Sequence, residues 1–157
     1  MCIKRLGRAS CAVVLFLLVA CTSEQDPVEE RVSALIGQIE QAIESRLVRE
    51  AVDYLHADYS DPRHVNRRAA GASLFGLVRG HRTIHLFSLI KTVTPAADQA
   101  SAQAVVYVAM TGVPVESIDA LISLKADMYR FDLGLVEQDG EWRVIRSRWE
   151  RVDPRVL

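Results

Sequence analysis

The stretch YRFDLGLVEQDGEWRVIRSRWERV, residues 129–152, constrains the fold more than any other part of the chain. Apolar and aromatic residues occupy the odd positions from 129 to 135, and polar Arg130 and Asp132 lie between them. Such alternation is typical of a strand with one buried face, as in antiparallel sheets. Asp139-Gly140 is a two-residue hairpin signal, because both central positions of that turn favour positive φ. The stretch therefore predicts two antiparallel strands joined directly at this turn.

The residues on either side of Gly80 follow different patterns. After it, segments rich in β-branched and aromatic residues predict strands at 82–94, 102–111, 123–137 and 142–151. Before it, apolar residues at helical spacing predict a helix from Pro27 to about residue 46. Further helices are predicted at 47–57, ended by Ser60-Asp61-Pro62, and at about 66–78. Helices followed by an antiparallel sheet define an α+β domain.

The element order and the closing hairpin resemble the nuclear transport factor 2-like superfamily, including its bacterial lipoproteins. The residues that carry this resemblance are the alternating strand, the acidic-glycine turn, Gly140-Glu141-Trp142-Arg143-Val144 and Trp149. The resemblance implies N-terminal helices packed in the concave face of a curved antiparallel sheet, a cone also called cystatin-like. The superfamily includes ketosteroid-isomerase-like and SnoaL-like enzymes beside non-catalytic binding modules, so this fold does not select a function.

The N-terminus has the pattern of a secretory signal peptide. Lys4, Arg5 and Arg8 precede an apolar run that ends at Ala20. The run is about half the length of roughly 20 residues that a membrane-spanning helix needs. Leu18-Val19-Ala20-Cys21 resembles a bacterial lipobox. That resemblance implies cleavage before Cys21, whose thiolate takes a diacylglycerol before the new N-terminus is acylated as well. The alternative is an ordinary signal peptide with an incidental cysteine.

The sequence therefore predicts three parts: a lipoprotein signal peptide at 1–20, a lipidated N-terminus and short tether at 21–26, and a single domain at 27–157. Several acyl chains suffice for stable membrane attachment. As flexible chain, the tether reaches on the order of 12 Å, so the domain should lie against the membrane. Thr22 follows the cysteine where an inner-membrane signal has Asp. By resemblance to enteric sorting rules, this favours the outer membrane, facing the periplasm.

The charge of the mature chain argues against nucleic acid as a partner. Three of the 19 basic residues lie within residues 1–20, which leaves 16 against 20 acidic residues. A nucleic-acid-binding protein would carry a positive surplus. Cys21 is the only cysteine of the mature chain, so no intramolecular disulfide is expected.

No sequence motif predicts a cofactor or a metal. The chain lacks G-x-G-x-x-G and P-loop patterns, and Gly71-Ala72-Ser73-Leu74-Phe75-Gly76 has the wrong spacing for a G-x-S-x-G nucleophile elbow. His81 and His85 would suit zinc on a helix, but in a strand they stand about 13 Å apart. Zinc needs its ligands within about 2.1 Å, so these histidines, like His56 and His64, are interpreted as ordinary.

Asp127 is the main candidate catalytic residue, with Tyr129 and Tyr107 as candidate partners. By alternation it shares the face of Tyr129 and Phe131, which would point a carboxylate into the apolar interior of the cone. Desolvation there would favour a general base, and Tyr129 or Tyr107 would donate to a developing enolate oxygen, as the ketosteroid-isomerase resemblance implies. The alternative is that Asp127 lies at the cone mouth, either solvated or paired with an arginine such as Arg130, Arg146 or Arg148.

Two hypotheses follow from the sequence. The favoured one is a non-catalytic lipoprotein that binds a hydrophobic small molecule or an envelope protein, with a homodimer as a further possibility. The alternative is a small ketosteroid-isomerase-like or SnoaL-like enzyme centred on Asp127. For Trp142 and Trp149, packing within the domain is favoured over stacking on a ligand.

Overall fold

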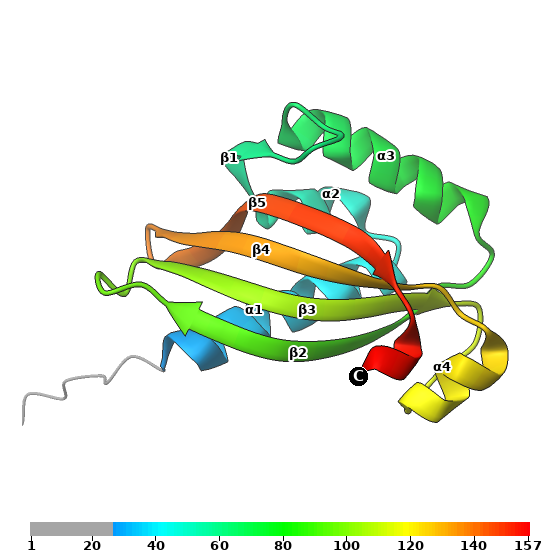
Figure 1. Cartoon of the computed structure of the whole chain (residues 1–157). Helices are drawn as coiled ribbons and strands as arrows, with labels where there is room; N and C mark the ends of the chain where they lie inside the picture. Colours follow the sequence, from blue (N-terminus) through cyan, green and yellow to red (C-terminus); the bar gives the residue numbers. More distant parts are fainter. Residues whose placement is uncertain (1–26) are drawn as a thin grey trace, which may run out of the picture.

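The computed structural model describes residues 27–157. The predicted signal peptide, Cys21 and the tether to residue 26 lie outside the described residues. The elements are α1 (Val28–Glu44), α2 (Val48–Asp53), β1 (Leu55–Ser60), α3 (Arg67–Gly80), β2 (His85–Pro95), β3 (Ser101–Thr111), α4 (Ile118–Leu124), β4 (Met128–Gln138), β5 (Glu141–Val152) and the 3₁₀ helix η1 (Pro154–Val156). The sheet has the order β1-β5-β4-β3-β2, and the predicted α+β class is confirmed (Figure 1).

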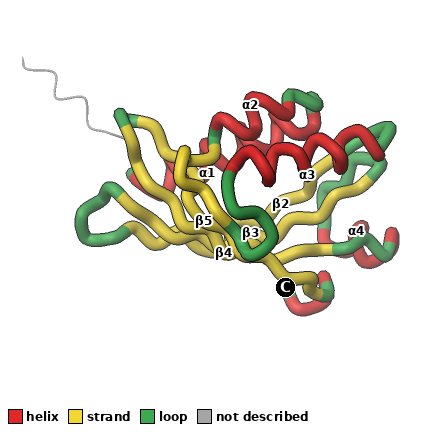
Figure 2. The backbone as a smooth tube through the Cα atoms, turned by 90° about the horizontal axis from the view of Figure 1, so that it is seen from above, coloured by secondary structure: helices red, strands yellow, loops and turns green. Residues whose placement is uncertain are grey.

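Helix α1 lies on one face of the curved sheet, and α2 and α3 lie on the same side (Figures 1 and 2). Its predicted apolar stripe is buried at Val28, Val32, Leu35 and Ile36. These side chains pack in one cluster with residues of β3, β4 and β5, among them Trp142. Glu29 and Glu30 occupy the first turn, where the helix dipole favours negative charge. None of the helices among residues 27–157 is both long and apolar enough to cross a membrane.

The hairpin between β4 and β5 forms as the sequence predicts. Asp139 and Gly140 have φ values of 55° and 83°, the positive values that the two-residue turn requires. The strands pair antiparallel from Gln138↔Glu141 to Met128↔Val152, with an irregularity in register between Gly134 and Leu135.

Alternation places two clusters on opposite faces of the sheet. Val106 of β3 and Leu135 of β4 pack towards α1. Ala109 and Met128 are fully buried in a second cluster with Leu121 of α4. Helix α4 therefore covers the other face of the sheet near one end of β3 and β4.

Two segments differ from their predicted structure. The helix expected at 47–57 ends at Asp53, and residues 55–60 form β1, which pairs parallel with β5. The free edge of β5 provides hydrogen-bonding partners for this segment, and that tertiary pairing outweighs the local helical pattern. The strand expected from residue 123 begins at Met128, because residues 118–124 form α4, whose N-terminus is capped by Ser117 accepting a hydrogen bond from the Ala120 N–H.

Candidate functional site

Asp127 lies at the rim of the sheet, immediately before β4. Its side chain is 47% exposed and forms an ion pair with Arg151 of β5. Arg151 is a different arginine from those that the sequence suggested as partners. A carboxylate in this setting is solvated and charge-paired, not enclosed by apolar side chains.

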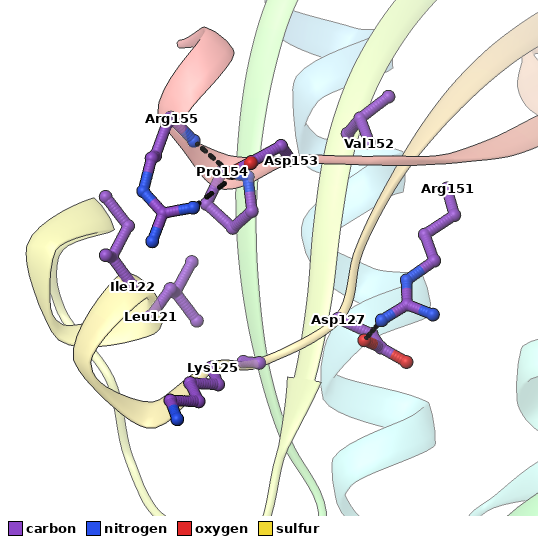
Figure 3. Close-up of a pocket in the computed structure, with 10 residues that line it drawn as sticks. Leu121, Ile122, Lys125, Asp127, Arg151, Val152, Asp153, Pro154 and Arg155 are labelled. Carbon is purple, nitrogen blue, oxygen red and sulfur yellow. Dashed lines mark hydrogen bonds and ion pairs between the residues drawn. The ribbon is translucent and has the colours of Figure 1, made fainter.

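The Asp127–Arg151 pair lines the larger of two hollows near this end of the sheet, here called the terminal hollow (Figure 3). Its volume is about 530 Å³, which is within the size range of small-molecule sites. Its other lining residues come from α4, the loop that follows α4, the end of β5 and η1: Leu121, Ile122, Lys125, Ala126, Val152, Asp153, Pro154 and Arg155.

Local capping builds the two walls of the terminal hollow. Helix α4 ends at Leu124, and the capping residue Lys125 adopts the left-handed conformation with φ 50°. The N–H groups of Lys125 and Ala126 bond to the carbonyls of Ile122 and Leu121, and this turns the chain towards β4. On the opposite wall, Asp153 caps η1 by accepting a 2.9 Å hydrogen bond from the Arg155 N–H.

The charges of the terminal hollow are unevenly paired. Asp127 pairs with Arg151, and Asp153 pairs with Arg155 at 3.2 Å. The hydrogen bond from the Arg155 N–H, together with the Arg155 guanidinium, holds the pKa of Asp153 below its usual value. Among the described residues, no carboxylate forms an ion pair with the exposed Lys125. The hollow therefore has one more cation than it has anions.

A second, smaller hollow of about 280 Å³ adjoins the first. It is lined by Met110, Thr111, Gly112, Val113, Leu124 and Ala126, and Ala126 also lines the terminal hollow. Val113 and Leu124 are each 51% exposed, and both line this hollow. A mainly apolar surface thus continues directly from the charged hollow.

The three candidate residues Asp127, Tyr129 and Tyr107 lie in different surroundings. Tyr129 occupies the same face of β4 as Phe131 and Leu133. Tyr107 packs on the other face, in the cluster of Ala109, Leu121 and Met128. The space between α1 and the sheet is filled by the core cluster, which includes Trp142 at 5% exposure.

Glu40 of α1 is a partly buried carboxyl that no sequence pattern singled out. Its Oε1 atom is buried and has no hydrogen-bond partner among the described residues. Burial raises the pKa of Glu40, the Ser88 hydroxyl opposes that rise, and the negative charge of Glu44 adds to it.

The densest polar cluster of the described residues links β1, α3 and β5. The Asp61 carboxylate accepts hydrogen bonds from the Tyr59 hydroxyl at 2.8 Å and from the N–H groups of Arg63 and His64 at 2.7 and 2.8 Å. His64 Nδ1 lies 2.8 Å from Asp61 Oδ2, and His64 Nε2 lies 2.8 Å from Ser73 Oγ. We refer to Asp61, His64 and Ser73 as the relay.

Aromatic side chains cover the relay from the sheet. The His64 ring stacks on Trp149 of β5, with ring centroids 6.2 Å apart, and Trp149 stacks on Phe131 at 5.8 Å. The Arg63 guanidinium lies 5.2 Å from the centre of the Trp149 ring. Trp149 therefore makes packing contacts within the domain, as predicted.

Buried hydrogen bonds set the protonation of the relay's acidic end. Burial acts to raise the pKa of Asp61, but the hydrogen bonds from His64, from the Arg63 and His64 N–H groups and from Tyr59 outweigh it, so the pKa lies below its usual value. Burial also raises the pKa of Tyr59, despite an opposing hydrogen bond with Ser147. Asp61 is thus an ionised carboxylate and Tyr59 a neutral hydroxyl at neutral pH.

No protein-family model and no curated protein matches the chain, but solved structures do. Aln2 from a Streptomyces species superposes with a TM-score of 0.65 at 13% identity, over 84% of this chain and 96% of that one. A nuclear transport factor 2-like protein of unknown function from Pseudomonas putida gives 0.58 at 19% identity, over 78% and 84%. A Nostoc punctiforme protein with a cystatin-like fold gives 0.59 at 8% identity, over 79% and 90%.

The chain has the nuclear transport factor 2-like fold. At these identities the similarity concerns the fold alone, which hosts unrelated functions. The terminal hollow and the relay are therefore interpreted from their own residues.

Sequence reasoning missed the relay of this nuclear transport factor 2-like domain. An available signal was Asp61-Pro62-Arg63-His64, in which a carboxylate precedes a histidine within one turn. His81 and His85 lie apart from the relay, His81 at the end of α3 and His85 at the start of β2. Among residues 27–157, no group of three or more His, Cys, Asp or Glu side chains is arranged to hold a metal ion.

Proposed function

We propose that the protein is a lipid-anchored bacterial envelope protein whose domain binds a small amphipathic anion in the terminal hollow. The observation that carries this proposal is a hollow of about 530 Å³ with apolar and cationic lining, in which Lys125 has no carboxylate partner among the described residues. The binding is non-catalytic. Cys21 holds the domain on the periplasmic side of the outer membrane, within reach of a ligand released from the membrane.

The lining supports a ligand with one charged end and one apolar end. Lys125 supplies an ammonium for a carboxylate or phosphate group, and Ile122, Val152 and Pro154 supply apolar contacts. The smaller hollow continues past Ala126 to Val113 and Leu124. An alkyl chain lying there would cover two half-exposed apolar side chains, at about 25 cal/mol per Å² of apolar surface removed from water.

The setting of Asp127 favours binding over the alternative of an Asp127-centred enzyme. A general base of the ketosteroid-isomerase type needs a carboxylate enclosed beside its substrate. Asp127 is half-exposed and paired with Arg151 at the rim of an open hollow. Removal of its charge would free the Arg151 guanidinium for an anionic ligand. Asp127→Asn should therefore leave binding unchanged or strengthen it.

The proposal is tested in two steps on the full-length lipoprotein. Native mass spectrometry after gentle extraction from the membrane should show acyl mass on Cys21 and a small anionic molecule retained by the domain. Titration with decanoate as the probe, in a non-ionic detergent, should then give saturable binding. Lys125→Gln should weaken that binding about tenfold, because a charge-assisted hydrogen bond contributes about 1.5–3 kcal/mol.

Lys91→Gln is the matched control, because Lys91 is also exposed but lies on β2, away from the terminal hollow. Equal weakening by both variants would show that decanoate binds through general charge and would refute the site. A protein adduct or a bare dimer without retained ligand would instead point to an envelope-protein partner or a homodimer. Retention of Met1 and absence of acyl mass would refute the anchor.

A further inference from the structure

We propose that Ser73 is an activated nucleophile, with His64 as its general base and Asp61 as the residue that positions the imidazole. The chemical class of substrate is a small carboxylic ester, whose acyl group Ser73 would accept and pass to water. This activity is separate from ligand binding in the terminal hollow and uses none of its lining residues.

The hydrogen-bond geometry assigns the proton positions. An ionised carboxylate only accepts hydrogen bonds, so the 2.8 Å contact with Asp61 Oδ2 places a hydrogen on His64 Nδ1. In the neutral ring, Nε2 is then an acceptor, and its 2.8 Å partner Ser73 Oγ must be the donor. A serine hydroxyl that donates to an imidazole, which in turn donates to a buried carboxylate, is the arrangement that activates serine nucleophiles on unrelated folds.

The relay is buried at Asp61, which positions the imidazole, and exposed to solvent at Ser73, which would react. The Asp61 side chain is 1% exposed and its carboxylate is fixed by four donors, whereas the His64 side chain is 17% exposed. Trp149 stacks on the His64 ring and restricts its orientation. Ser73 is exposed on α3, so an ester can approach its hydroxyl oxygen from solvent.

The acyl-transfer step balances with groups on the chain. Ser73 Oγ attacks the ester carbonyl carbon as its proton passes to His64 Nε2, and the bond between that carbon and the alkoxy oxygen breaks. The alkoxide leaves as an alcohol with the proton from Nε2. Water then attacks the acyl-serine, giving its proton to Nε2. The carboxylic acid departs, and Ser73 Oγ is reprotonated from Nε2.

The backbone around Ser73 differs from that of a nucleophile elbow. Ser73 lies in the interior of α3, where amide N–H groups bond to helical carbonyls and are not free to form an oxyanion hole. The nearest cation of the cluster, the Arg63 guanidinium, stacks on Trp149, and no contact among the described residues places it beside Ser73. The activity should accordingly be modest and favour esters with good leaving groups.

A fluorophosphonate probe tests the nucleophile directly in the full-length protein. Peptide mass spectrometry should find the phosphonyl group on Ser73. Ser123 is an internal control, because it is another exposed helical serine but its hydroxyl donates to the Asp119 carbonyl. Ser73 should react at least about 100-fold faster than Ser123, the lower end of the range for general-base assistance.

His64→Asn distinguishes activation from simple exposure. Asn Nδ2 can replace the Nδ1 donor to Asp61, which preserves the fold, but it offers no base to Ser73. Labelling of Ser73 and hydrolysis of p-nitrophenyl acetate should both fall about 100-fold, with the urea unfolding midpoint within error of wild type. Equal labelling of Ser73 and Ser123, or unchanged labelling in a folded His64→Asn variant, would overturn the proposal.

Discussion

Replacing Tyr59 by Phe tests how much the polar cluster contributes to stability. The Tyr59 hydroxyl has one hydrogen, which it donates to Asp61 at 2.8 Å, so Ser147 must donate to it across 2.7 Å. Both Tyr59 and Ser147 are buried, at 5% and 8% exposure. The substitution changes almost no volume, so its effect comes from hydrogen bonding and not from a cavity.

The expected loss of unfolding free energy follows from these two hydrogen bonds. A hydrogen bond to a charged group contributes about 1.5–3 kcal/mol, and a buried hydroxyl left without a partner costs about 1–3 kcal/mol. We expect Tyr59→Phe to lower the free energy of unfolding by about 3 kcal/mol, measured by urea denaturation at neutral pH. Ser147→Ala added to this variant should restore part of the loss, because no donor would then remain unpaired.

Tyr54→Phe is the control for this experiment. Tyr54 packs against the same core cluster, but its hydroxyl group forms no hydrogen bond with any residue in the range 27–157. Its removal should change stability by less than about 0.5 kcal/mol. Equal effects of the two substitutions, or a loss below about 1 kcal/mol for Tyr59→Phe, would refute the role assigned to the cluster.

Four further substitutions have effects that the structure predicts. Glu40→Gln should stabilise the domain on the order of 1 kcal/mol at neutral pH. Burial raises the pKa of Glu40 in the folded state. The gain in stability should therefore vanish below about pH 4.3, the pKa of Glu in the unfolded chain, because wild-type Glu40 is then protonated in both states. Urea unfolding midpoints of variant and wild type across about pH 3–8 measure this difference. Gly71→Ala should destabilise the domain, because the new Cβ would lie 2.7 Å from Val52 Cγ2. Gly76→Ala should stabilise the domain by up to about 1 kcal/mol, because nothing lies within 4 Å of the new Cβ. Melting temperatures of the two variants should therefore shift in opposite directions. Leu121→Ala should cost about 2–5 kcal/mol in urea unfolding, because Leu121 of α4 is fully buried against Ala109 and Met128 of the sheet.

Elements whose signals are local could be predicted from the amino-acid sequence alone. The apolar stripe of α1 and the positive-φ turn at Asp139-Gly140 each depend on residues within a few positions of one another. Helical spacing and strand alternation report directly which face becomes buried. The α+β class and the β4–β5 hairpin were therefore predictable before any contact between distant segments was known.

The short elements and both candidate sites depend on contacts between segments that are distant in sequence. Leu55–Ser60 became a strand because β5, about 90 residues later, offers a free edge beside it. Asp127 pairs with Arg151 and not with an arginine of the predicted set, because the β4–β5 register places Arg151 opposite Tyr129, two residues from Asp127. No local sequence pattern singles out His64. Its contacts depend on α3, which places Ser73 beside one ring nitrogen, and on β5, which places Trp149 against the ring face. Contacts between separate elements depend on how those elements pack, and residue spacing alone does not encode that geometry.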